Sequence, residues 1–151
     1  MELLHELYAE NTFDMVHMMN SLDHSFDPLH GLLELLFICK VGGKIILRHA
    51  ENEAVNQKYE GLHQWNLSLL NEEKSFVIWN GNGRHDVCEL LSNYADFELY
   101  PMDSENDGHN VVVITKTNRI DIPSDADYYS EIIHDCNYKF LLNVLMSIRI
   151  G

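Results

Sequence analysis

The stretch FDMVHMMN, Phe13–Asn20, decides the fold together with the forty residues around it. It is apolar with little alternation, as expected of a strand buried on both faces. Asp27–Pro28 is typical of a helix start, with Asp as the N-cap and Pro in the first turn. Apolar residues then recur at spacings of three and four as far as Gly42–Gly43, a helix-end signal. The run KIILR, Lys44–Arg48, follows as the next strand.

A strand, a capped helix and a second strand make one βαβ unit, which predicts an α/β protein with a parallel sheet and a right-handed crossover. Downstream, the pattern predicts two strands, a turn and a short helix, in the order Leu62–Leu69, Phe76–Trp79, Gly81–Gly83 and Asp86–Tyr94. Phe97–Met102 and Asn110–Lys116 are predicted to form an antiparallel strand pair at one edge. After Pro123, apolar residues at helical spacing predict one long amphipathic helix.

Composition and charge restrict the class of protein. The 151 residues fit one domain, and 46% hydrophobic residues allow a core. The net charge of -14 argues against nucleic acid or an anionic membrane as the main partner, because both need clustered cations. Three well-separated cysteines without a CxxC pair indicate free thiols. No signal-peptide pattern or membrane-length apolar run is present, so a cytoplasmic location is expected.

The order of these elements resembles the second half of a class I S-adenosylmethionine (SAM)-dependent methyltransferase. Phe13–Asp14 matches the Phe-Asp that opens the fourth strand of that family, and Val41–Leu47 (VGGKIIL) is similar to its "LKPGG" turn and fifth strand, with Val41 in place of Pro. The resemblance covers about residues 8–116. It implies a partial Rossmann-like sheet of strands four to seven, the last one antiparallel, followed by the C-terminal helix.

The first half of the family's fold has no counterpart here. That half holds SAM with a Gly-rich GxGxG turn and an acidic residue after the second strand, and the only GxG of this chain, Gly81–Gly83, lies outside any strand-to-helix crossover. We therefore expect residues 1–117 to be the C-terminal half of a methyltransferase domain, truncated at its N-terminus, and residues 118–151 to be a helical extension. SAM would bind only if the missing half is supplied.

Ligands of such sheets bind beyond the carboxyl ends of the parallel strands. The resemblance implies that the residues after the first strand contact the cofactor: Asn20, Ser21 and Leu22. His24 is the candidate general base, because an imidazole titrates near neutral pH, and Asp23 would orient it or contact the substrate. The candidate acceptor pocket comprises His49, Glu51, His63 and Trp65. The segments Asn20–His24, His49–Glu53 and Gly61–Asn66 together resemble one bacterial branch of small-substrate methyltransferases.

Each of these residues has a structural alternative, as a turn cap, a hydrogen-bonded loop histidine or a core side chain. A metal site is the competing interpretation, with ligands drawn from His24, Asp27, His30, His49, Glu51 and His63. No HxxxH or HExxH pair occurs, and nine histidines make coincidence easy, so no metal site is expected.

Two functions remain open. One is methylation of a small-molecule acceptor by SAM, with this chain expected to be inactive alone. The other is a non-catalytic interaction or oligomerisation module derived from a methyltransferase. The second follows from the absent Gly-rich strand, which would leave the edge of the first strand unpaired and open to a second copy or to a complementary N-terminal half.

Overall fold

The computed structural model describes residues 3–70, 72–102 and 108–121. The helix predicted after Pro123 lies outside these residues, as does Cys136. None of the described helices is long and apolar enough to cross a membrane.

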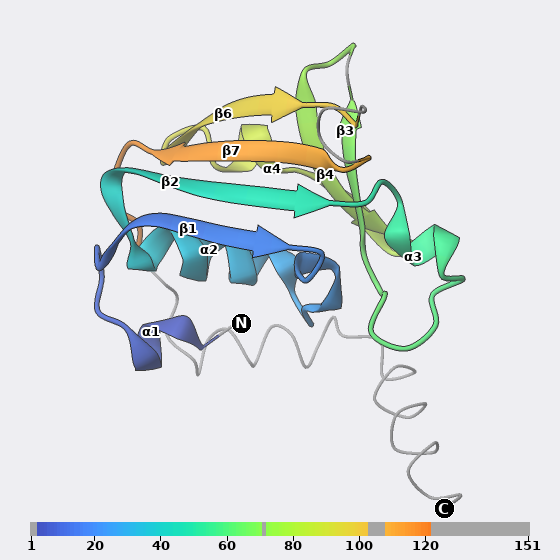
Figure 1. Ribbon diagram of the computed structural model, residues 1–151, viewed down its shortest axis with the longest axis horizontal. Coiled ribbons are helices and arrows are strands. Elements are labelled where there is room, and N and C mark those ends of the chain that lie inside the picture. The colour runs from blue at the N-terminus through green and yellow to red at the C-terminus, as the bar shows by residue number, and fades with distance from the viewer. Residues whose placement is uncertain (1–2, 71, 103–107, 122–151) are drawn as a thin grey trace, which may run out of the picture. The chain divides into compact units, whose positions relative to one another are not determined.

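The main sheet has four strands in the order β1-β2-β7-β6, which are Phe13–Met19, Cys39–His49, Asn110–Lys116 and Ala95–Tyr100 (Figure 1). β1 and β2 are parallel, and β7 runs antiparallel to both of its neighbours. The predicted α/β class, the parallel first pair and the antiparallel pair at one edge are therefore confirmed. The last strand alone is reversed, because a short connection from β6 can only return antiparallel.

The helix α2 (Pro28–Ile38) connects β1 to β2. Asp27 is its N-cap, and Asp27 Oδ1 accepts hydrogen bonds from the backbone N–H groups of Leu29 and His30 at 2.8 and 3.2 Å. The prediction that the helix continues to Gly42–Gly43 was wrong, since the chain is already in β2 from Cys39.

The two glycines instead shape an irregular start of β2. Gly42 has a φ of +81°, which favours glycine. A Cβ on Gly43 would lie 2.8 Å from Cys39 Sγ and 2.9 Å from the carbonyl oxygens of Asp14 and Lys40. The bulge between β1 and β2 therefore depends on the absence of a side chain at Gly43.

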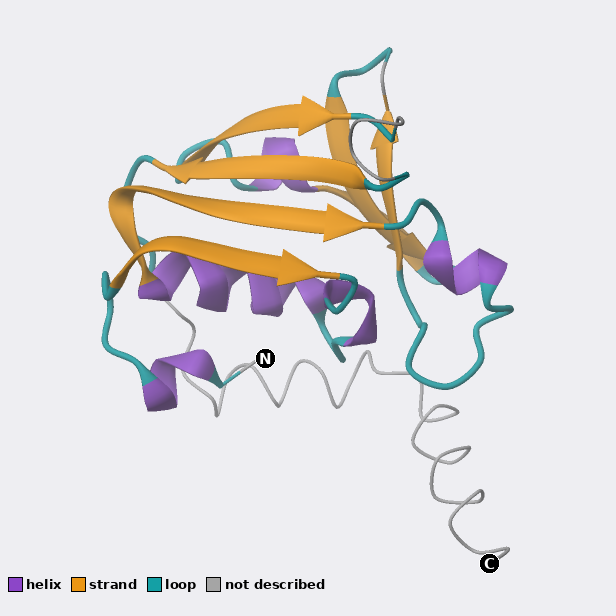
Figure 2. Ribbon diagram, in the orientation of Figure 1, coloured by secondary structure: helices purple, strands orange, loops and turns teal. Residues whose placement is uncertain are grey.

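A second, antiparallel sheet is inserted between β2 and β6, with the order β3-β4-β5 (Figure 2). Its strands and the remaining short helices are α1 (Leu4–Leu7), η1 (Leu22–His24), α3 (Glu53–Asn56), β3 (Asn66–Leu70), β4 (Ser75–Asn80), β5 (Gly83–Asp86) and α4 (Val87–Leu90). The predicted turn at Gly81–Gly83 joins β4 to β5. β5 was not predicted, because GRHD carries no apolar alternation.

One hydrophobic core joins both sheets and α2 on the same side of the main sheet. Its fully buried members include Leu32 and Leu36 from α2, Ile45 from β2, and Phe76 and Ile78 from β4. α2 covers β1 and β2 from behind in the view of Figure 1.

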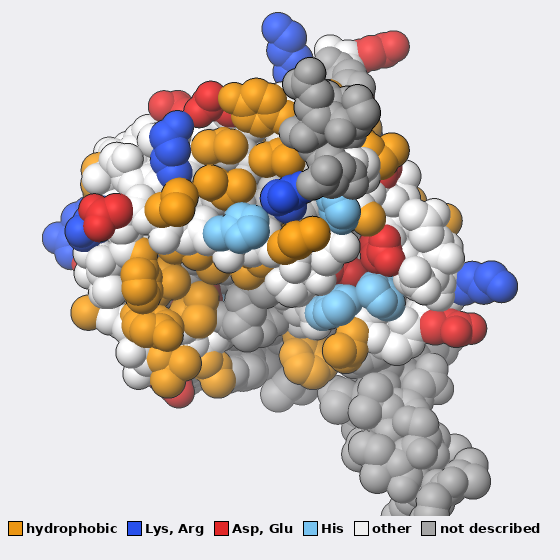
Figure 3. All heavy atoms as spheres, in the orientation of Figure 1, with side chains coloured by type: hydrophobic (Ala, Val, Ile, Leu, Met, Phe, Trp, Pro, Cys, Tyr) orange, Lys and Arg blue, Asp and Glu red, His pale blue; other side chains and the backbone are white. Residues whose placement is uncertain are grey.

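The opposite face of the main sheet is less covered. Met15 and Met19 of β1 are 62% and 49% exposed, and His17 between them is exposed too. The prediction of a strand buried on both faces is therefore wrong for β1, because no described helix packs on this face. In Figure 3, hydrophobic side chains gather over this face of the sheet.

Candidate functional site

Asn20 links the carboxyl ends of β1 and β2 through two hydrogen bonds. Its backbone N–H donates to the Arg48 carbonyl oxygen at 2.8 Å, and its side-chain Oδ1 accepts from the backbone N–H of Ala50 at 2.9 Å. Asn20 has a φ of +44°, a left-handed conformation that Asn tolerates better than most residues. The chain turns there and leads directly into η1, which carries Asp23 and His24.

Asp23, His24 and His63 form one cluster at this edge. His63 Nδ1 lies 2.8 Å from Asp23 Oδ2 and 3.3 Å from His24 Nε2, and His24 Nε2 lies 3.4 Å from the same Asp23 oxygen. The two imidazole rings meet edge to face with centroids 4.6 Å apart. The Asp23 side chain is 5% exposed, whereas those of His24 and His63 are 34% and 30% exposed. The structure thus joins the two predicted catalytic residues to one predicted substrate residue.

The loop between α3 and β3 brings His63 to this cluster. Gln64 donates from its side-chain Nε2 to the carbonyl oxygens of Tyr59 and Gly61 at 3.1 and 2.9 Å, which closes the loop on itself. The Gln64 backbone N–H donates to the Asp23 carbonyl oxygen at 3.4 Å, and Trp65 Nε1 donates to that of Phe26 at 3.3 Å. The backbone contact of Gln64 therefore holds the His63 segment against η1.

The three predicted cofactor residues differ in what they offer. The Asn20 amide is engaged with Ala50 and lies 3.5 Å from His109 Nε2. Ser21 is half-buried at the start of η1. Leu22 is 3% exposed and belongs to the hydrophobic core.

The other predicted pocket residues have contacts of their own, outside the three-residue cluster. His49 is buried, stacks on Phe76 at a centroid distance of 5.5 Å, and lies with Nδ1 3.3 Å from the Ala50 carbonyl oxygen. Burial lowers the pKa of His49 to about 4, against the opposing effects of the Ala50 carbonyl and of the Asp23 charge. Trp65 is half-buried and bonded to Phe26.

Glu51 has a partner that the sequence did not suggest. Its Oε2 accepts a hydrogen bond from Asn110 Nδ2, and Asn110 Oδ1 accepts one from the Met102 backbone N–H at 2.7 Å. Neither Asn110 nor His109 was predicted for the site. A polar residue at the start of an otherwise β-branched strand was the one available signal for Asn110.

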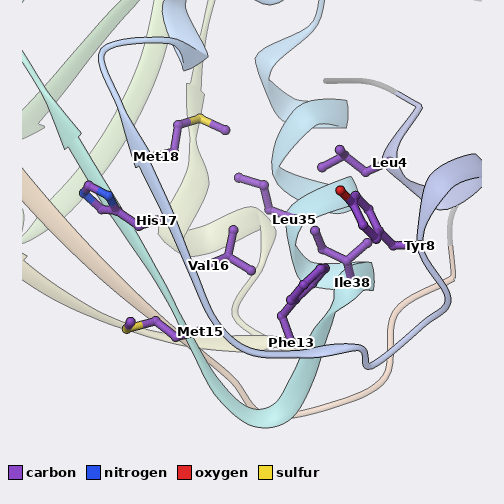
Figure 4. Close-up of a pocket in the computed structure, with 9 residues that line it drawn as sticks. All are labelled: Leu4, Tyr8, Phe13, Met15, Val16, His17, Met18, Leu35 and Ile38. Atoms are coloured by element: carbon purple, nitrogen blue, oxygen red, sulfur yellow. The ribbon is translucent and has the colours of Figure 1, made fainter.

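Two pockets lie near the predicted site residues or along β1. One, of about 310 Å³, has Glu51, Ser68 and Trp79 in its lining, and Trp79 Nε1 donates to Ser68 Oγ there at 2.9 Å. The other is a groove of about 480 Å³ along β1 (Figure 4). Its described lining comes from α1, β1 and α2: Leu4, Tyr8, Phe13, Met15, Val16, His17, Met18, Leu35 and Ile38. Neither pocket includes the cluster, which lies at the surface.

No protein-family model matches this sequence, and no curated protein matches it either. Solved structures give distant likenesses. The chain is similar to the T. thermophilus 16S rRNA N2 G1207 methyltransferase in complex with AdoMet and guanosine, with a TM-score of 0.44 and 11% identity over 78% of this chain and 24% of that one.

Two further likenesses are of the same kind. A SAM-dependent methyltransferase from Methanosarcina mazei gives a TM-score of 0.40 and 15% identity, over 75% of this chain and 63% of that one. A third likeness is a chain of the complex between the Haloferax volcanii Trm112 methyltransferase activator and a protein described as a methyltransferase. It gives a TM-score of 0.46 and 14% identity, over 76% of this chain and 58% of that one. This chain spans less than two thirds of the length of each of these structures.

Proposed function

We propose that this chain supplies the acceptor side of a SAM-dependent methyltransferase site for a small-molecule acceptor and has no methyltransferase activity alone. The observation that carries the proposal is the position of the Asp23–His24–His63 cluster. It lies directly beyond the carboxyl end of a parallel strand, in a sheet with the one reversed strand that the resemblance implies.

The cluster suits an acceptor that must lose a proton. SAM, when bound, supplies an electrophilic methyl group. Within this chain, His24 Nε2 and His63 Nδ1 are the nitrogens that can hold the proton of an acceptor hydroxyl or amine, and both lie beside the Asp23 carboxylate. Both rings are partly exposed, so an acceptor can reach them from solvent.

The described residues do not by themselves fit SAM. The Asn20 amide is already engaged, Leu22 is in the core, and Gly81–Gly83 is a hairpin turn between antiparallel strands. A hairpin turn lacks the helix N-terminus that follows the glycines of a dinucleotide-type site. We therefore infer that a complementary half must provide most of the cofactor contacts.

A methyl-transfer assay tests the proposal by supplying the partner protein and the small-molecule acceptors in separate steps. The folded protein, immobilised through its C-terminus, is incubated with a complete extract of its own cells and washed. It then receives methyl-labelled SAM and a deproteinised extract as the source of acceptors. We expect labelled small molecules only after incubation with the complete extract, because that step alone provides the missing half.

Two variants decide whether the cluster takes part. His24→Ala should retain the captured partner but lose most of the transfer, and His85→Ala, a histidine substitution in β5, should behave as wild type. Absence of transfer after the complete extract, or equal transfer by His24→Ala, would contradict the proposal. Transfer by the chain before any exposure to protein extract would contradict its inactivity alone.

Self-association is a second candidate function, favoured by the open side of β1. No strand pairs with this side among the residues that the structure describes, and the apolar groove of Figure 4 runs beside it. An unpaired apolar edge favours pairing with another chain.

Light scattering tests this candidate. A dimer should form in solution and dissociate in Met15→Lys, because Met15 lies on the groove and is largely exposed. Leu90→Lys, at an equally exposed position in α4, is the matched control and should remain dimeric. A wild-type monomer would exclude self-association.

A further inference from the structure

The contacts within the Asp23–His24–His63 cluster cannot all be satisfied by protons. An ionised carboxylate only accepts hydrogen bonds, and each imidazole nitrogen carries at most one proton. If both His24 Nε2 and His63 Nδ1 donate to Asp23 Oδ2, two N–H groups face each other across 3.3 Å. If His24 Nε2 is instead unprotonated, the His63 Nδ1–H can donate to Asp23 Oδ2 and also face the His24 lone pair, and only the 3.4 Å contact between His24 Nε2 and Asp23 Oδ2 is left without a proton.

A cation accounts for all three contacts at once, because all three lone pairs can then face the same centre. Donor atoms bound at about 2.0–2.1 Å to one tetrahedral ion stand roughly 3.3–3.4 Å apart. Two of the three separations, 3.3 and 3.4 Å, already have this value, and the third is shorter at 2.8 Å. The three atoms come from two segments about forty residues apart, yet lie at the spacing of a ligand set.

The kind of ion follows from the donors. Two imidazole nitrogens and one carboxylate oxygen suit zinc and its transition-metal neighbours, whereas magnesium and calcium prefer oxygen ligands. The Asp23 side chain is buried, while both histidines are about one-third exposed. Three protein ligands with one open side leave a coordination position for water or for a ligand atom.

The ligands are also held in place without an ion. Asp23 and His24 lie in η1, and Gln64 fixes the loop that carries His63 and bonds to the Asp23 carbonyl oxygen. A site whose ligands are positioned in advance binds with less loss of side-chain entropy.

We propose that Asp23 Oδ2, His24 Nε2 and His63 Nδ1 bind one divalent transition-metal ion of the zinc class. The site rests on its own geometry and does not depend on the proposed methyl transfer. With the ion bound, His24 is a ligand and no longer a proton acceptor. The open position can then hold a water molecule or a ligand oxygen or nitrogen, and the ion would make that group more acidic.

The test is a zinc titration of the tag-free, EDTA-treated full chain against a competing chelator dye, repeated with Co²⁺ followed by its visible absorption. We expect one equivalent per chain, with the strong absorption of four-coordinate Co²⁺. Asp23→Asn, His24→Ala and His63→Ala should each weaken zinc binding by at least about tenfold. His85→Ala is the matched control for the other histidines and should bind as wild type.

A stability readout separates lost ligands from lost folding. Zinc should raise the melting temperature of the wild type and of His85→Ala, but not that of His63→Ala or of the more conservative His63→Gln. Circular dichroism establishes beforehand that the variants are folded. Absence of saturable one-to-one binding in the wild type, or undiminished binding in both His24→Ala and His63→Ala, would overturn the proposal.

Discussion

Two clusters in this protein each combine two histidines with one carboxylate, and they differ in geometry. In the first, Glu34 of α2 is fully buried and lies between His5 of α1 and His30 of α2. Glu34 Oε2 accepts from the His5 backbone N–H at 2.7 Å, and Glu34 Oε1 contacts His5 Nδ1 and lies 3.1 Å from His30 Nε2. In the second, Asp23, His24 and His63 face one another at an edge open to solvent.

The difference shows that residue types alone do not define a site. In the Glu34 cluster both imidazole nitrogens contact the carboxyl group of Glu34. Because His5 belongs to α1 and Glu34 to α2, these contacts link the two helices. In the Asp23 cluster each of the three atoms also faces the other two, so that hydrogen bonds account for two of the three contacts, whereas a bound ion accounts for all three. The first cluster is therefore structural, and the second is the candidate site.

The largest expected effect is a loss of stability when the buried carboxyl group of Glu34 is changed. Glu34→Gln should lower the free energy of unfolding by about 3 kcal/mol, because a buried amide cannot accept every bond that the carboxyl group accepts. Urea unfolding followed by circular dichroism measures it. The exposed Glu89→Gln should change the value by less than about 0.5 kcal/mol. Equal effects of the two substitutions would remove the structural role of the Glu34 cluster.

A comparable effect is expected from acid, through His49. Its pKa is lowered from 6.5 to about 4 in the folded protein, so the unfolded chain takes up a proton first as the pH falls. The free energy of unfolding is therefore unaffected by protonation of His49 above pH 6.5. It falls by about 1.4 kcal/mol per pH unit as the pH drops from 6.5 towards 4.

Midpoints of urea denaturation, measured between pH 7 and pH 4, test whether stability falls as the pH falls. His49→Phe removes the titrating group and should flatten the pH dependence in this range, because Phe can keep the stacking on Phe76. If the wild type and His49→Phe lose stability in parallel, the acid sensitivity belongs to other groups.

The smallest stability effect is expected in the open cluster. Asp23→Asn keeps an oxygen that can accept from His63, so the metal-free protein should lose about 1 kcal/mol or less. The same substitution should remove the stabilisation by zinc. A loss as large as that in Glu34→Gln would mean that the Asp23 cluster is structural too, and the contrast between the two clusters would fail.

Much of the fold could be predicted from local patterns. Asp27–Pro28 predicted the start of α2, and the run Asn110–Lys116 predicted β7 to the residue. The end of α2 and the strand β5 could not be predicted, because long-range pairing decides them. Cys39 pairs with Phe13, and the strand GRHD is stabilised by its pairing with β4 rather than by its own residues.

The candidate site could be predicted in part. Position after a parallel strand indicated Asp23 and His24, and His63 came from the resemblance of its segment. That the three form one cluster could not be predicted, since an irregular loop closed by Gln64 brings His63 to η1 and has no periodic signature. For the same reason no metal site was expected from the sequence, where the ligands show no regular spacing.

The most direct test is anomalous diffraction at the zinc edge from crystals of the full chain soaked in zinc chloride. The predicted result is one strong peak about 2.0–2.2 Å from Asp23 Oδ2, His24 Nε2 and His63 Nδ1, and none at the Glu34 cluster. A peak at Glu34 with none at Asp23, or no peak at either cluster, would contradict the assignment of Asp23, His24 and His63 as a ligand set.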